Sequence, residues 1–216
     1  MTNEKRHLEI VRACEEDLLK YGDNYRGVGW TKKPEYADLR YRVMLDLLRG
    51  REPATLLDIG CGTAMLNDYL LAHGMDHVTY SGLDLSPAYL QVSRAKYPQA
   101  TFHEADILDA DTVLPVHDYV VMNGLFNFKG SMSFDQMWEY MRAMLVRADQ
   151  LCTRGFAFNV MSKYLDWERD DLFHLPFDQL AGFLDANISR HFTLRHDYAL
   201  FEYTTYVYKV PTGADG

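Results

Sequence analysis

Apolar residues recur at intervals of three and four along the first part of the chain, which is typical of amphipathic helices. The pattern runs from Leu8 to Leu18 and returns over residues 36–48. Between them, the glycine-broken and aromatic segment 21–30 is either a loop that folds over a pocket or a surface loop anchored by its aromatic side chains. We therefore predict a helical N-terminal cap over residues 1–50.

From residue 54 onward, short apolar runs alternate with segments of helical periodicity, which predicts a parallel sheet covered by helices on both faces. The strands are expected at about 54–59, 78–84, 100–104, 117–123, 155–160, 190–198 and 200–209. The helices are expected at about 63–73, 87–96, 134–148 and 176–187, with an irregular link near 107–114. The last two strands have almost no linker between them, so they must form an antiparallel hairpin. The predicted fold class is α/β, with a doubly wound, mostly parallel sheet of seven strands.

The length of 216 residues fits a single domain, with its main body at 51–210, the cap as part of it, and a disordered tail at 211–216. Apolar residues make up 48% of the chain and charged residues 25%, which is typical of a soluble globular protein. No apolar run approaches the roughly 18 residues that cross a bilayer, and the N-terminal residues lack the apolar core of a secretory signal. We therefore expect a cytoplasmic protein without a membrane partner.

The formal net charge of −9 argues against a nucleic-acid partner, because such binding depends on basic patches that release counterions. Cys14, Cys61 and Cys152 are far apart and show no CxxC or nearby Cys/His spacing. We therefore expect neither a disulfide framework nor a zinc site.

A glycine turn follows the first predicted strand, in the run Thr55-Leu-Leu-Asp-Ile-Gly-Cys-Gly-Thr-Ala64. Gly60 and Gly62 lack side chains where a ligand approaches the backbone, and the amides that open the next helix point toward such a ligand. A dinucleotide fingerprint would need a third glycine at the position of Met65, and a P-loop would need a Lys-Ser/Thr pair after the turn. The turn therefore indicates a nucleotide-like ligand of another kind.

Acidic residues follow the next two predicted strands. Asp84 ends the second strand, and a carboxylate at the carboxyl end of a strand can accept one hydrogen bond on each oxygen from a ribose diol. The following Ser86-Pro87 starts a helix with a good N-cap and a proline at its first position. Asp106 follows the third strand, although Asp109 and Asp111 lie close enough to compete for the same assignment.

Together, these motifs and the strand count resemble the class I S-adenosylmethionine-dependent methyltransferases of small-molecule type, over about residues 54–210. The resemblance implies a Rossmann-like fold, S-adenosylmethionine as the cofactor and S-adenosylhomocysteine as the product. The N-terminal helices resemble the cap that many members place over the cofactor. Ala64 stands where family members often have a third glycine, and the Asn-Pro-Pro-Tyr motif of many amide and adenine N-methyltransferases is absent.

The resemblance also implies roles for individual residues. The glycine loop contacts the methionine portion of the cofactor, Asp84 the ribose and Asp106 the adenine amino group. Residues that follow the fourth strand face the sulfonium, where asparagine and aromatic side chains suit a cation. The expected cofactor-binding residues are Trp30, Arg40, Asp58, Gly60, Cys61, Gly62, Asp84, Leu85, Asp106, Ile107, Asn123, Gly124 and Phe126.

Two of these residues have alternative interpretations. Arg40 either clamps the carboxylate of the cofactor with its guanidinium or is an ordinary solvated helix arginine. Trp30 either closes over the methionine arm or anchors the segment by packing.

No motif identifies the catalytic residue. The candidates at strand ends and in the aromatic insertion are His196, Tyr164 and Asn159, followed by Trp167, His174 and Tyr198. Asp197 stands beside His196 and could orient its imidazole, whereas a lone histidine near a turn is more often structural.

The predicted activity is methyl transfer from S-adenosylmethionine to a small-molecule acceptor, with oxygen as the target atom, by in-line displacement. A monomer or homodimer that needs no metal is expected, because no cluster of acidic metal ligands is evident. Two alternatives stay open: an aminopropyl transferase that uses the decarboxylated cofactor, as in polyamine synthesis, and a non-catalytic protein that binds S-adenosylmethionine.

Overall fold

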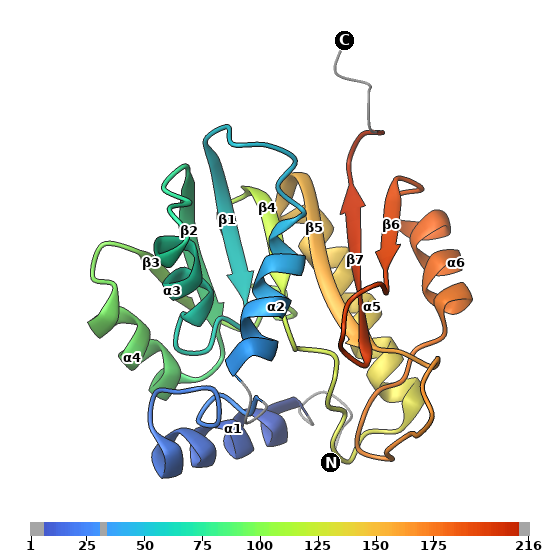
Figure 1. The fold of residues 1–216 in the computed structure, drawn as a ribbon, viewed down its shortest axis with the longest axis horizontal. Helices are drawn as coiled ribbons and strands as arrows, with labels where there is room; N and C mark the ends of the chain where they lie inside the picture. The colour runs from blue at the N-terminus through green and yellow to red at the C-terminus, as the bar shows by residue number, and fades with distance from the viewer. Residues whose placement is uncertain (1–6, 31–33, 212–216) are drawn as a thin grey trace.

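A seven-stranded sheet forms the centre of the molecule, with helices on both faces, in the computed structural model, which describes residues 7–30 and 34–211 (Figure 1). The strands are β1 (Ala54–Ile59), β2 (Val78–Asp84), β3 (Thr101–Glu104), β4 (His117–Met122), β5 (Cys152–Met161), β6 (Phe192–Arg195) and β7 (Glu202–Tyr208). The helices are α1 (His7–Tyr21), α2 (Pro34–Leu45), α3 (Met65–Ala72), α4 (Pro87–Lys96), α5 (Phe134–Gln150) and α6 (Phe177–Asn187). The predicted α/β class is confirmed.

The strand order in the sheet is β3-β2-β1-β4-β5-β7-β6. The strands β1 to β5 run parallel, whereas β7 is antiparallel to both of its neighbours, β5 and β6. The predicted terminal hairpin is therefore confirmed. The strand order reverses direction at β1, which pairs with both β2 and β4, and ligands of open α/β sheets bind at the carboxyl ends of the strands at such a point.

Side chains of the central strands alternate between two hydrophobic layers, because successive side chains of a strand point to opposite faces. Leu57 and Ile59 of β1 pack with α5 and α6, whereas Leu56 packs in the other layer with α2 and α3. Both faces of β1 are thus buried, which explains its continuous apolar run.

The helices begin where the sequence supplies capping groups. The Ser86 Oγ accepts a hydrogen bond of 3.2 Å from the Tyr89 amide, and Pro87 occupies the first turn of α4. Ser133 and Gln136 form a reciprocal capping box at the start of α5. Such caps satisfy backbone amides that have no partner within the helix.

The bounds of β5, β6 and β7 differ from the prediction by up to three residues. The strand β5 begins at Cys152 rather than 155, because Cys152 already pairs with His117 of β4. The strand β6 ends at Arg195 and β7 begins at Glu202, so residues 196–201 form a true connection in place of an almost absent linker. The expected tail at 211–216 lies outside the described residues except for Pro211.

The N-terminal helices lie in different places relative to the sheet. The helix α1 lies across the carboxyl ends of β1 and β2, and α2 covers one face of the sheet (Figure 1). Within residues 7–30 and 34–211, no helix has the length and apolar character needed to cross a membrane.

Candidate functional site

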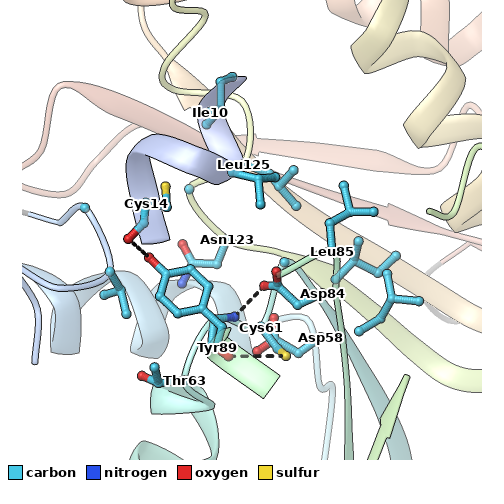
Figure 2. Close-up of a pocket in the computed structure, with 18 of the residues that line it drawn as sticks. Ile10, Cys14, Asp58, Cys61, Thr63, Asp84, Leu85, Tyr89, Asn123 and Leu125 are labelled. Carbon is cyan, nitrogen blue, oxygen red and sulfur yellow. Dashed lines mark hydrogen bonds between the residues drawn. The ribbon is translucent and has the colours of Figure 1, made fainter. Parts of the chain in front are cut away.

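A cavity of about 420 Å³ lies between α1 and the carboxyl ends of β1, β2 and β4. Its size is within the range of small-molecule sites. Most of the expected cofactor-binding residues line it, namely Trp30, Asp58, Gly60, Cys61, Gly62, Asp84, Leu85, Asp106, Ile107, Asn123 and Gly124. Figure 2 shows the side chains of Asp58, Asp84 and Asn123 gathered around this space.

The glycine turn needs backbone conformations that favour glycine. Gly60 has φ +74°, Gly62 has φ +54°, and even Ala64, at the start of α3, has φ +61°. The amides of Gly60 and Cys61 both donate to the Leu83 carbonyl oxygen, at 2.8 and 3.1 Å, so the turn is fastened to β2. A methyl group at Gly60 would lie 2.6 Å from the Cδ1 of Leu125, another cavity residue.

Replacing Gly60 by alanine is therefore expected to destabilise the protein by roughly 1–2 kcal/mol and to lower cofactor affinity by about tenfold. The first effect comes from the positive φ and the second from displacement of Leu125. Thermal unfolding and isothermal titration calorimetry with S-adenosylmethionine measure the two effects. Gly74→Ala is the matched control, because Gly74 has φ +61° with nothing within 4 Å of the added carbon, and it should lower stability without changing affinity.

Asp84 joins the end of β2 to the glycine turn. Its Oδ2 accepts a hydrogen bond of 2.8 Å from the Gly62 amide, and its Oδ1 accepts one of 2.9 Å from the Ser86 amide. Burial raises the pKa of Asp84, and these two amides act against that shift. Since each carboxylate oxygen can accept a second hydrogen bond, Asp84 can hold the turn and still bind a diol.

Asp58 is a buried carboxyl group at the end of β1. Its Oδ2 accepts a hydrogen bond of 2.9 Å from the Tyr80 hydroxyl. Burial raises the pKa of Asp58 to about 7, helped by the negative charge of Asp84 and opposed by the hydrogen bond from Tyr80. A cationic group in the cavity would favour the charged form of this carboxyl group.

Asp106 and Ile107 form another part of the wall, together with Tyr140 and Met144 of α5. The Asp106 Oδ1 accepts a hydrogen bond of 2.9 Å from the Leu108 amide, which fixes the carboxylate at the start of the loop. The Ile107 side chain is buried, as is expected of a residue that packs against a planar ring.

Asn123 contributes a polar group without a protein partner. It follows β4, is 8% exposed, and neither its Oδ1 nor its Nδ2 has a hydrogen-bond partner among the described residues. The Thr63 Oγ1, also on the cavity wall, is unpartnered in the same part of the chain. A buried polar group without a partner costs about 1–3 kcal/mol, so both residues are suited to bind a ligand.

The helix α1 covers the cavity with Ile10, Cys14 and Asp17. The Tyr89 hydroxyl of α4 lies 3.0 Å from the Cys14 carbonyl oxygen, an interaction that Figure 2 marks. The Ser86 Oγ donates to the Glu15 carboxylate at 2.6 Å. These contacts hold α1 against α4, so the cavity is closed on the side of α1.

Two expected cofactor residues lie away from the cavity lining. Both Nε and Nη2 of Arg40 donate to the Glu202 carboxylate, at 2.8 and 2.7 Å, so the guanidinium clamps a carboxylate of the protein itself. Phe126 is fully buried in the core against Phe158. Gly124, with φ +81°, turns the chain so that Leu125 lines the cavity instead of Phe126.

The three leading catalytic candidates are also outside the cavity lining. The Asn159 Oδ1 accepts a hydrogen bond of 2.7 Å from the amide of Gly124, a lining residue, so Asn159 supports the cavity wall from outside the cavity. Tyr164 is 69% exposed, and its ring contacts that of Phe177 at a tilt of 39°. His196 contacts the same ring edge-on and is exposed.

Several lining residues were not predicted. Asp17, Tyr41, Tyr89 and Tyr140 all contribute to the wall. Asp17 follows the apolar positions 10 and 14 at helical spacing, so an acidic residue on that stripe was an available signal. The tyrosines have no such signal, because aromatic residues at helical spacing are equally typical of a core.

In the part of the chain that the structure describes, no group of three or more His, Cys, Asp or Glu side chains could hold a metal ion. Independence from metal stays a prediction.

Comparisons with known proteins agree with this site. A model of the methyltransferase domain family matches residues 56–148. A protein of Mycobacterium tuberculosis (strain ATCC 25618 / H37Rv), named "Putative methyltransferase Rv1506c", is 31% identical over 166 residues, which are 76% of this chain and 98% of that protein.

Solved structures share the fold. Magnesium protoporphyrin IX methyltransferase from Synechocystis PCC 6803, with bound S-adenosylmethionine, superimposes with a TM-score of 0.64 at 14% identity, over 97% of this chain and all of that one. Human N-acetylserotonin methyltransferase gives a TM-score of 0.67 at 14% identity, over 97% of this chain and 60% of that one. With its parallel sheet, terminal hairpin and glycine turn, the chain belongs to the class I S-adenosylmethionine-dependent methyltransferase family.

Proposed function

We propose that this methyltransferase methylates a hydroxyl oxygen of a small, uncharged acceptor, by in-line displacement. The oxygen–methyl bond would form as the sulfur–methyl bond breaks, with S-adenosylhomocysteine as the leaving product and the hydroxyl proton released to solvent. The observation that carries the proposal is Asn123, a buried amide with both polar atoms unpartnered among the described residues, on the wall of the cavity. A hydroxyl group can donate to the Oδ1 and accept from the Nδ2 of this side chain, so it satisfies both.

The residues around the cavity fit the cofactor. Asp84 would bind the ribose diol, Asp106 and Ile107 the adenine, and the turn from Asp58 to Gly62 the methionine portion. When bound, S-adenosylmethionine supplies an electrophilic methyl group on a sulfonium. Four carboxylates on the wall, of Asp17, Asp58, Asp84 and Asp106, suit a cationic ligand.

The remaining wall supports an acceptor of low polarity. Ile10 of α1, Trp30, Leu125 and Phe128 are apolar lining residues. The described lining residues include carboxylates but no lysine or arginine, so a negatively charged acceptor would meet repulsion without a counter-charge. The structure of human N-acetylserotonin methyltransferase is an example of the same fold in an enzyme named for a small molecule.

In this proposal the protein works mainly by positioning. The Asn123 amide orients the acceptor hydroxyl, and α1 covers one side of the cavity. We further propose that the protein acts in the cytoplasm, as a monomer or homodimer, without a metal or a membrane partner. Its formal net charge of −9 argues against a nucleic-acid partner.

The proposal is tested with methyl-labelled S-adenosylmethionine and a panel of small phenols and alcohols, each paired with the matching amine and carboxylate. We expect label in the uncharged hydroxyl compounds, and a loss of kcat/KM on the order of tenfold to a hundredfold in Asn123→Ala. Asn187→Ala on α6 is the control, since its exposed side chain donates to the Phe183 carbonyl oxygen within the same helix and does not line the cavity.

Each other result has a distinct meaning. Label in amines alone contradicts oxygen as the target, and label in carboxylates contradicts the charge argument. Cofactor binding without turnover across the whole panel would contradict the proposed acceptor class.

A further inference from the structure

Glu202 is a buried carboxylate that the proposed function does not use. It begins β7 and is 1% exposed. Its Oε1 accepts from the Arg40 Nε at 2.8 Å and from the Asn159 Nδ2 at 2.7 Å. Its Oε2 accepts from the Arg40 Nη2 at 2.7 Å and from the Asn127 Nδ2 at 2.9 Å.

These contacts continue to the cavity wall and close into a ring. The Arg40 guanidinium lies 5.0 Å from the centre of the Trp30 ring. The Trp30 indole packs over Gly124, with its Nε1 3.5 Å from the position of a Cβ there. The Gly124 amide donates to the Asn159 Oδ1, and Asn159 donates to Glu202. We call these five residues the Glu202 ring.

The Glu202 ring joins parts of the chain that are far apart in sequence. Arg40 belongs to α2, Asn159 to β5 and Glu202 to β7, whereas Trp30 and Gly124 line the cavity. Asn127 attaches the same loop to Glu202 a second time. The loop 124–127 is therefore held at both ends, directly or through Asn159, by one carboxylate.

Stability alone does not explain such a network. Removing two charged groups from water costs free energy, and their mutual attraction in a buried ion pair often does no more than offset that cost. A protein with apolar side chains of similar volume in their place is frequently as stable. A buried carboxylate that accepts four hydrogen bonds, as Glu202 does, instead selects one geometry. Here the selected geometry is that of Trp30 and of the residues from Asn123 to Leu125.

We propose that Glu202 and Asn159 are positioning residues: through the Glu202 ring they set the place of the loop 123–128 and of Trp30, and so the shape of the acceptor side of the cavity. This assignment to the acceptor side rests on the proposed function. The carboxylate of Glu202 fixes Arg40 above the indole, and Asn159 transmits its position to the Gly124 amide.

The test is Asn159→Ala in a protein whose other tryptophans are replaced, Trp138→Phe and Trp167→Phe, so that Trp30 alone reports by fluorescence. Hydrogen exchange should become about tenfold faster at the Gly124 amide, the effect of roughly one lost hydrogen bond. Trp30 emission should shift to the red, and affinity for S-adenosylmethionine should fall about fivefold to tenfold. The faster exchange reports the lost hydrogen bond itself. The changes in Trp30 emission and in cofactor affinity report transmission through the Glu202 ring, because Asn159 does not line the cavity.

A double variant, Arg40→Met with Glu202→Gln, removes the whole ion pair. It leaves no unpaired buried charge. It should give the same faster exchange over 124–127. Asp149→Asn is the matched control, because the Lys209–Asp149 ion pair joins α5 to the end of β7 without contact to the cavity. It should lower the melting temperature and leave the three readouts unchanged.

A folded Asn159→Ala protein with normal Gly124 exchange, Trp30 emission and cofactor affinity would overturn the proposal. So would equal changes in Asp149→Asn, since the effect would then follow stability alone. Exchange and emission need no ligand, so a failed acceptor screen with wild-type protein would contradict the proposed function and leave these two readouts as an independent test.

Discussion

Replacing Asp84 by alanine is expected to weaken S-adenosylmethionine binding by about a hundredfold, or roughly 3 kcal/mol. Two charge-assisted hydrogen bonds to the ribose are lost in the proposed binding mode. The amides of Gly62 and Ser86 lose their acceptor as well, so the glycine turn is released from the end of β2. Isothermal titration calorimetry with S-adenosylmethionine and S-adenosylhomocysteine measures the loss, which should be similar for both because they share the ribose.

The matched control is Asp118→Ala. The Asp118 Oδ2 accepts hydrogen bonds of 2.8 and 2.9 Å from the amide and hydroxyl of Thr55, at the opposite end of the sheet. Its loss should lower the melting temperature and leave cofactor affinity unchanged. Binding by Asp84→Ala that equals wild type would contradict the proposed contact with the ribose.

Replacing Asp58 by asparagine is expected to stabilise the cofactor-free protein at pH 8 and to change it little near pH 4. The folded-state pKa of about 7 lies above the ordinary value of 3.8, because burial disfavours the charged carboxylate. At pH values between 3.8 and about 7, Asp58 therefore keeps its proton in the folded protein and loses it in the unfolded chain. Wild-type stability therefore falls as pH rises through this window, by up to about 1.4 kcal/mol per pH unit.

Asparagine keeps an acceptor for the Tyr80 hydroxyl and carries no charge, so the variant should lack this fall. Denaturant unfolding at several pH values measures the difference. The other titratable groups around Asp58 are Tyr41, Cys61, Tyr80 and Asp84. Burial raises the pKa of each of them, and both proteins contain all four.

Cofactor binding tests the same group in a second way. We expect wild-type affinity to rise with pH up to about 7, as Asp58 ionises to meet the ammonium of the cofactor. Asp58→Asn should lose this part of the pH dependence. The cofactor's own amino group titrates in both experiments, so its effect cancels in the ratio of the wild-type affinity to the Asp58→Asn affinity. Parallel pH profiles would mean that Asp58 does not face the ammonium.

Most of the expected cofactor residues that reach the cavity lie at the carboxyl ends of strands, where short segments of sequence place them. The glycine turn follows β1, Asp84 is the last residue of β2 and Asp106 lies two residues after β3, and all three reach the cavity. In a parallel sheet the carboxyl ends of neighbouring strands share one edge, so strand order alone brings these residues together. Their place in the cavity supports the assigned contacts with the cofactor, which the binding experiments test.

Arg40 shows where this reasoning ends. A helix arginine ahead of a glycine loop matches a cofactor clamp, yet its partner Glu202 is 162 positions away. That pairing depends on β7 lying beside β5, with Glu202 opposite Met161 and on the same face as Asn159. Phe126 is a second case, because the positive φ of Gly124 decides which of two neighbouring apolar residues lines the cavity.

The sequence by itself determined the alternation of strands and helices, the antiparallel end of the sheet and the position of the glycine turn. These features follow from periodicity and backbone preference, which act over a few residues. Only the tertiary structure decided which side chains line the cavity, which carboxylate binds Arg40, and that the Asn123 amide has no partner within residues 7–30 and 34–211. These depend on strand register and on burial, because a polar group removed from water must find its partner wherever the fold places one.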